Sequence, residues 1–174
     1  FILDAYDEFF RWDRAMMRAT MLNAAESILK KAGFEVSERC ISRASCFDFA
    51  ARKNNQLTLI KVSSDISQVS ARDAFELKEI STYMPAIPLL ISSRARDKPL
   101  ENDTVYRRYN ICAITITTLR DTVVRGMYPL VEAGPGGYYV NLDGKKIRER
   151  RQKLGLSIGK LSEILGISRR ALYS

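Results

Sequence analysis

Hydrophobic and polar positions alternate with two different periods along this chain. Residues 3–20 and 21–34 place apolar side chains at helical spacing, which predicts two helices, the second of which ends near Gly33. The same spacing predicts helices over residues 70–84 and 117–127, the second of which stops near Gly126. Ser70 suits the first position of the earlier one, because serine accepts a hydrogen bond from the first turn.

Short segments of strand character lie between these helices. Strands are expected over residues 34–38, 45–53, 57–62, 86–92 and 110–116. Asn54 and Asn55 suit a hairpin turn between the second and third strands, because asparagine tolerates positive φ. The order of the elements, α-β-β-β-α-β-β-α, predicts an α/β domain with a mixed sheet between helices.

The pattern changes after residue 131, where "EAGPGG" has the glycine and proline content of a linker or a sharp turn. The segment "YYVNL" follows as a strand or extended arm, and only helical pieces come after it. We therefore expect four parts. They are an N-terminal helical extension (1–20), the α/β domain (21–133), a Gly-rich linker and arm (134–142) and a small all-α module (143–174).

Composition narrows the possible functions. Apolar residues make up 46% of the 174 residues, and the chain has no histidine, which removes histidine metal sites and Ser-His-Asp triads. No apolar run approaches the roughly 20 residues of a membrane span, and the first residues do not resemble a secretory signal. The three cysteines form no C-x-x-C pair. We expect reduced thiols, a cytoplasmic location and no membrane partner.

The positive charge is concentrated near the C-terminus. The net charge is +8, and residues 143–174 hold nine basic and three acidic side chains. That module therefore accounts for most of the excess. A basic module on a nearly neutral body is expected to meet phosphate.

Within the module, "LGLS" and "LGIS" each separate two helical pieces. Gly155 and Gly166 suit the positive φ of a helix end, and Ser157 and Ser168 suit the start of the next helix. A small core is expected from Ile147, Leu154, Leu156, Leu161, Ile164, Leu165, Ile167 and Leu172. Two short helices joined by such a turn form a helix-turn-helix.

The module resembles the helix-turn-helix of phage-repressor-type (XRE-like) transcription regulators. The matching residues are Gly155, Leu156, Ser157, Leu161, Glu163, Leu165, Gly166, Ile167, Ser168, Arg169 and Leu172. Ile158 and Ser162 depart from the family's usual glutamine and alanine. The sequence ends at Ser174, inside the recognition helix that the resemblance implies.

This resemblance implies that the recognition helix enters the major groove while the start of the preceding helix meets phosphate. The implied DNA-binding residues are Ser157, Lys160, Ser168, Arg169, Arg170, Tyr173 and Ser174. The alternative is that the basic segments are solvated faces of a helical pair that binds protein.

Around Asp48 and Lys61, the order of elements resembles the restriction-endonuclease-like fold, which places an acid on one strand and Glu-x-Lys on the next. Asp48 matches the first acid and Lys61 the lysine, but Leu59 stands where the second acid is required. Leucine offers no oxygen to Mg²⁺, and Glu26 is at best a peripheral ligand. The resemblance therefore implies a vestigial site without a metal. Alternatively, Asp48 only forms an ion pair, with Lys61 or Arg52 across the hairpin.

Together, the two halves resemble a family of archaeal predicted transcription regulators over roughly residues 21–174. The resemblance implies a sequence-specific regulator that binds double-stranded DNA, catalyses no reaction and needs no cofactor or metal. We expect a homodimer. The sequence leaves open whether the N-terminal domain dimerises, makes a second DNA contact or senses a small-molecule effector. The competing hypothesis is a divalent-metal-dependent DNA nuclease guided by its own DNA-binding module, and a third is a partner protein that uses the basic helices to bind protein.

Overall fold

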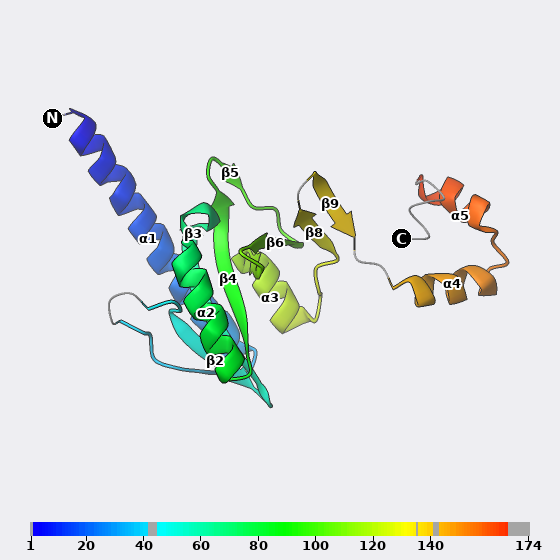
Figure 1. The fold of residues 1–174 in the computed structure, drawn as a ribbon, viewed down its shortest axis with the longest axis horizontal. Coiled ribbons are helices and arrows are strands. Elements are labelled where there is room, and N and C mark those ends of the chain that lie inside the picture. Colours follow the sequence, from blue (N-terminus) through cyan, green and yellow to red (C-terminus); the bar gives the residue numbers. More distant parts are fainter. Residues whose placement is uncertain (1, 42–44, 135, 141–142, 167–174) are drawn as a thin grey trace. The chain divides into compact units, whose positions relative to one another are not determined.

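The computed structural model of the chain describes residues 2–41, 45–134, 136–140 and 143–166. Side chains are described from Trp12 onward. The chain divides into two compact units, one reaching Tyr139 and the other beginning at Val140 (Figure 1). None of the described helices is both long enough and apolar enough to cross a membrane.

The first unit is built on a mixed sheet, as expected from the order of elements. The strands of the described residues are β1 (Glu35–Val36), β2 (Phe49–Lys53), β3 (Gln56–Asp65), β4 (Ala86–Ala95), β5 (Lys98–Pro99), β6 (Thr104–Arg108), β7 (Ile111–Ile114), β8 (Val131–Gly134) and β9 (Gly137–Val140). Their order across the sheet is β1-β2-β3-β4-β7-β6-β8-β9, and β5 pairs with β4. The pairs β3–β4, β4–β7 and β6–β8 are parallel.

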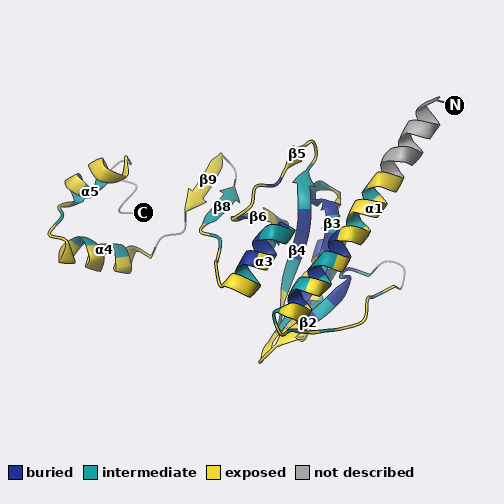
Figure 2. Ribbon diagram, turned by 180° about the vertical axis from the view of Figure 1, so that it is seen from behind, coloured by how far each residue is buried: buried dark blue, intermediate teal, exposed yellow. Residues whose placement is uncertain are grey.

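Helices cover both faces of the sheet. Helices α1 (Ile2–Lys31) and α3 (Ile116–Arg125) share one face, which Figure 2 shows. Helix α2 (Ala71–Tyr83) covers the other face, after the short helix η1 (Ile66–Gln68). Each face has its own buried apolar cluster, because successive residues of a strand point to opposite sides. Ile60 and Val62 belong to the cluster under α1, and Leu59 belongs to the cluster under α2.

Several local predictions are confirmed. Ser70 begins α2 and accepts a hydrogen bond from the Asp73 amide. Asn54 has φ 54° in the turn between β2 and β3. Gly126 ends α3 with φ 69°, in the left-handed region that favours glycine.

The prediction of two separate N-terminal helices is wrong, because α1 runs without a break for 30 residues. The expected boundary lies between Thr20 and Met21. Neither residue is a helix-breaking glycine or proline, so the helix continues through it. Strands β5, β6 and β8 were not predicted. Glycine-rich residues 134–142 contain the end of β8 and all of β9. At the end of β8, a Cβ on residue 134 would lie 3.1 Å from the Tyr139 ring. Glycine suits this position because it has no Cβ.

Candidate functional site

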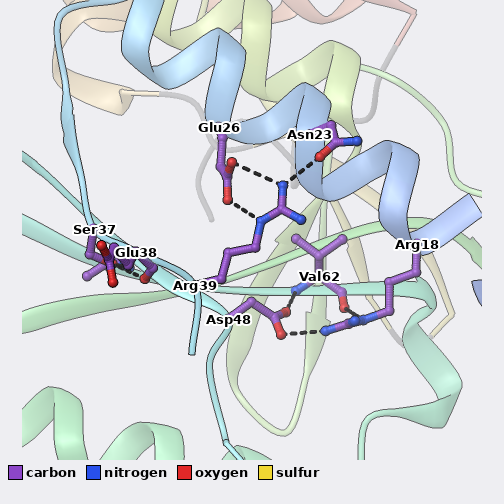
Figure 3. Close-up of polar contacts among 9 residues, drawn as sticks. Arg18, Asn23, Glu26, Ser37, Glu38, Arg39, Asp48 and Val62 are labelled. Carbon is purple, nitrogen blue, oxygen red and sulfur yellow. Dashed lines mark hydrogen bonds and ion pairs between the residues drawn. The ribbon is translucent and has the colours of Figure 1, made fainter. Parts of the chain in front are cut away.

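Asp48 lies one residue before β2, and its carboxylate faces α1 (Figure 3). The backbone of Asp48 still pairs with the next strand, because its amide donates to the Ile60 carbonyl at 2.7 Å. One carboxylate oxygen accepts from the guanidinium of Arg18, and the other accepts from the Val62 amide at 2.6 Å. Asp48 is only 6% exposed. Both of its oxygens are therefore engaged inside the protein.

The other two positions of the expected vestigial site, Leu59 and Lys61, lie on β3. Leu59 is 1% exposed and packs in the apolar cluster under α2. The Lys61 ammonium donates to the Ser45 carbonyl at 2.7 Å. The alternative pairing of Asp48 with Lys61 or Arg52 is wrong, because Asp48 pairs with Arg18 on α1, and Arg52 pairs with Glu35.

A second arginine, Arg39, bonds to Glu26 on α1, the acid considered above as a peripheral metal ligand. Arg39 donates to both oxygens of Glu26, at 2.6 and 3.1 Å, and to the side-chain oxygen of Asn23 at 2.6 Å (Figure 3). The hydrogen bond from the Arg39 guanidinium holds the pKa of Glu26 below its usual value. Within the described ranges, no group of three or more histidine, cysteine or acidic residues could hold a metal ion.

Sequence reasoning missed Arg18 and Arg39. A signal existed for Arg18, since it precedes the buried Met21 and Ala25 at helical spacing and therefore lies on the inward side of α1. A charged residue on an inward face is expected to have a buried partner. Arg39 follows β1 in an irregular segment, and its spacing carries no comparable signal.

The second unit contains α4 (Gly144–Lys153) and α5 (Ile158–Leu165). Gly155 has φ 62° in the connection, and Ser157 begins α5 by accepting from the Lys160 amide at 3.1 Å. Gly166 ends α5 with φ 66°. These local predictions are confirmed. The Arg151 guanidinium also donates to the Leu156 carbonyl at 2.7 Å, which ties α4 to the connection.

The predicted small core of this unit is wrong for three of its residues, because Leu154, Ile164 and Leu165 are exposed. Two short helices alone cannot enclose that many apolar side chains. Ile147, Leu156 and Leu161 are half-buried. The remaining expected core residues, Ile167 and Leu172, lie outside the described residues.

Two of the expected DNA-binding residues can be placed. Ser157 begins α5, and Lys160 in its first turn is exposed, with its ammonium 3.0 Å from Glu163. The rest of the expected set lies outside the described residues. These residues are Ser168, Arg169, Arg170, Tyr173 and Ser174.

Comparison with known proteins gives a family match and named relatives. Residues 18–129 match the protein-family model described as "PD-(D/E)XK superfamily domain". Relatives from the archaea Methanoregula boonei, Methanosphaerula palustris and Archaeoglobus fulgidus each bear the name "Putative HTH-type transcriptional regulatory protein". They are 42%, 45% and 39% identical to this chain over 90% of its length. The chain spans about half the length of these curated relatives, 50%, 52% and 50% respectively. No solved structure matches the chain.

Proposed function

Because the chain belongs to the PD-(D/E)XK superfamily, we propose that it keeps this nuclease fold without the nuclease activity and is a sequence-specific regulator of transcription that binds double-stranded DNA. The names of its relatives support the regulatory part of this proposal. The observation that carries it is the basic helix pair, in which a glycine-containing connection and a serine cap join α4 to α5.

Two short helices joined in this way are the first part of a helix-turn-helix. In such a motif, the start of the second of these helices would meet the DNA backbone, which gives Ser157 and Lys160 phosphate-binding roles. We further propose an XRE-like arrangement in which Ser168, Arg169, Arg170, Tyr173 and Ser174 belong to the base-reading helix. An arginine on that helix can bond bidentately to guanine.

Two contacts of Asp48 and the identity of residue 59 support the loss of catalysis. A Mg²⁺ site needs several carboxylate or carbonyl oxygens around one point. The oxygens of Asp48 are taken by Arg18 and the Val62 amide, and Leu59 supplies no oxygen. The residues present therefore do not fit a magnesium ion, and we propose that Asp48, Leu59 and Lys61 are vestiges of the family's metal site. We assign no cofactor to the protein.

The location and assembly follow from the same function. The free thiols of Cys40, Cys46 and Cys112 are in keeping with the reducing cytoplasm. One helix-turn-helix reads only a few base pairs, and related repressors bind palindromes as two-fold dimers. We therefore propose a cytoplasmic homodimer.

The specific alternative is a divalent-metal nuclease, which the superfamily itself favours. Incubation of the purified protein with plasmid and branched DNA in Mg²⁺ or Mn²⁺ separates the two functions. We expect the DNA to remain intact. Cleavage that disappears in Asp48→Ala and Lys61→Ala, while the exposed-site control Lys98→Ala still cleaves, would replace the regulator with the nuclease.

A further inference from the structure

The two edges of the sheet differ in how they are protected from a further strand. One edge is β1, which has only two residues and carries an ion pair between Glu35 and Arg52 of β2. Short length and charged side chains are features that keep an edge strand from pairing. The other edge is β9, which lies beside β8 (Figure 1). No described strand pairs with the outer side of β9.

Strand β9 lacks the protection that β1 has. Residues 133–142, which include it, carry no charge. All four residues of β9 are exposed (Figure 2), and Tyr138, Tyr139 and Val140 each keep more than half of their surface accessible. An open edge of this kind presents backbone N–H and C=O groups to which another strand can be added. The outer side of β9 is therefore a surface for strand pairing.

The two tyrosines of β9 are held on opposite faces of the sheet. The Tyr138 hydroxyl forms a hydrogen bond with that of Tyr106 on β6, which raises the pKa of Tyr138. Successive residues of a strand alternate between the faces, and the Tyr139 ring lies close to Gly134 on the other one. Side chains that are already positioned lose little freedom when a second strand pairs with the edge.

The side chains of β9 are complementary to those of a second copy. In an antiparallel pair about a two-fold axis, residues directly opposite each other lie on the same face. An axis through Tyr139 brings the two Tyr139 rings together on one face, and on the other face it brings Tyr138 beside Val140 of the second copy. Aromatic and β-branched side chains are favourable neighbours across two strands. An axis through Tyr138 would instead set Tyr139 opposite Gly137, which has no side chain.

The position of β9 in the chain also favours a second copy as the partner. Four residue steps separate Val140 from Gly144, the first residue of α4, and they span at most about 14 Å. With the axis through Tyr139, the two Val140 Cα atoms lie about 8 Å apart. The two α4 helices can then begin up to about 36 Å apart, which suits neighbouring half-sites about 34–36 Å apart. A strand from an unrelated protein would bring no second helix pair.

We propose that two copies of this chain pair through the outer edges of their β9 strands, antiparallel about a two-fold axis at Tyr139, and so form one continuous sheet. This names the interface of the dimer in the proposed function, and it rests on that function for the spacing of the helix pairs. An isologous interface uses the same surface of both copies. Because each β9 has four residues, the interface is small, and we expect a dissociation constant on the order of micromolar.

Cross-linking tests this register directly. In the proposed pair the two Tyr139 Cα atoms lie about 4.5–5.5 Å apart, a distance that a disulfide spans. With oxidised glutathione as the oxidant, which takes up the two electrons and two protons that the thiols lose, Tyr139→Cys should give a covalent dimer. Tyr83→Cys is the matched control, because Tyr83 is 82% exposed but ends α2. Both variants keep the three native cysteines.

We expect the covalent dimer to form at least about tenfold faster in Tyr139→Cys than in Tyr83→Cys, because pairing of β9 raises the effective concentration of the two thiols. Equal rates in the two variants would overturn the proposal.

Light scattering measures the same association without a cross-link. The chain should change from monomer to dimer as its concentration rises. Tyr139→Lys sets two positive charges opposite each other, and we expect it to weaken dimerisation on the order of tenfold. Tyr83→Lys adds the same charge away from β9 and should leave the dimerisation constant unchanged.

Two results of light scattering would contradict the β9 pair. Equal dimerisation constants of Tyr139→Lys and Tyr83→Lys would place the interface elsewhere. A chain that stays monomeric up to on the order of 100 µM would overturn the proposal and leave the edge to a strand of another protein.

Binding of the same proteins to DNA keeps this inference separate from the proposed function. Fluorescence anisotropy of labelled DNA measures that binding independently of the cross-link. A chain that binds its preferred DNA, but whose Tyr139→Cys variant cross-links no faster than the control, refutes the β9 pair alone. A Tyr139→Cys variant that cross-links but prefers no DNA sequence refutes the regulator and leaves the β9 pair in place.

Discussion

The α/β unit and the helix pair use arginine in opposite ways. In the α/β unit, Arg18, Arg39, Arg52 and Arg107 each form an ion pair with a carboxylate. In α4, six of ten residues are basic and one is acidic. A guanidinium that already has a carboxylate partner attracts little further negative charge, whereas unmatched basic residues attract a polyanion. In the function proposed above, the nuclease-like fold therefore serves as a body and the helix pair makes the contact with DNA.

The two units also differ in how they bury leucine. Leu59 is 1% exposed, whereas Leu154 at the end of α4 is 60% exposed. We expect Leu59→Ala to lower the free energy of unfolding of the α/β unit by about 2–5 kcal/mol, because it leaves a cavity. Leu154→Ala should change the stability by less than about 0.5 kcal/mol. Urea unfolding of both variants measures the difference, and equal losses would break the contrast between a closed core and an uncovered helix pair.

The next effect concerns base recognition. Arg169→Ala or Arg170→Ala should cost about 1–3 kcal/mol on the preferred site if that arginine bonds to a guanine. Arg120→Ala, which removes an exposed positive charge on α3, is the control and should have little effect. Anisotropy titrations on specific and random DNA measure these losses. Equal small losses of both arginine variants on both DNAs would mean that the two side chains contact only the backbone.

A smaller effect is expected at the start of α5. Lys160→Ala should weaken binding to all sequences alike and reduce the slope of log K against log salt by roughly one unit, because one phosphate contact is lost. The ion pair of Lys160 with Glu163 is exposed and holds the ammonium only weakly. Lys98→Ala in β5, also exposed, should keep the original slope. A slope that falls equally in both variants would remove Lys160 from the DNA contact.

The smallest effect concerns the ion pair between Glu26 and Arg39. The hydrogen bond from Arg39 lowers the pKa of Glu26 below its usual value of 4.5. The pair therefore stabilises the fold fully above that value, and its contribution is lost as pH falls through the lower pKa of the folded state. The stability of the protein minus that of Glu26→Gln should shrink between neutral pH and about pH 3. A difference that does not depend on pH would show that Arg39 gives Glu26 no electrostatic stabilisation.

The accuracy of the sequence predictions depended on how local each feature is. Ser70, Ser157 and Gly126 could be assigned because a helix end is determined by residues within one turn. The ion pair of Arg18 with Asp48 joins residues 30 positions apart, and only the fold brings them together. The mixed α/β class therefore follows from the sequence, but the partner of the key acid does not.

The missed strands have a related cause. Strand β6 reads "TVYRR", in which the arginines weaken the apolar alternation that identifies strands. Its partners β7 and β8 come from both sides of α3, so its pairing is set by tertiary structure. Tyr109 and Asn110, both with positive φ, form the turn to β7, and tyrosine gives little warning of such a turn.

One measurement tests the central claim most directly, namely that this member of a nuclease superfamily recognises DNA and does not cut it. The full-length protein is incubated in Mg²⁺ with a library of random duplexes, and both the bound molecules and any new ends are sequenced. The account predicts enrichment of one palindromic sequence, with half-sites about 34–36 Å apart or a multiple of that distance, and no new ends. A bound pool without an enriched sequence, or new ends that disappear with Asp48→Ala, would contradict it.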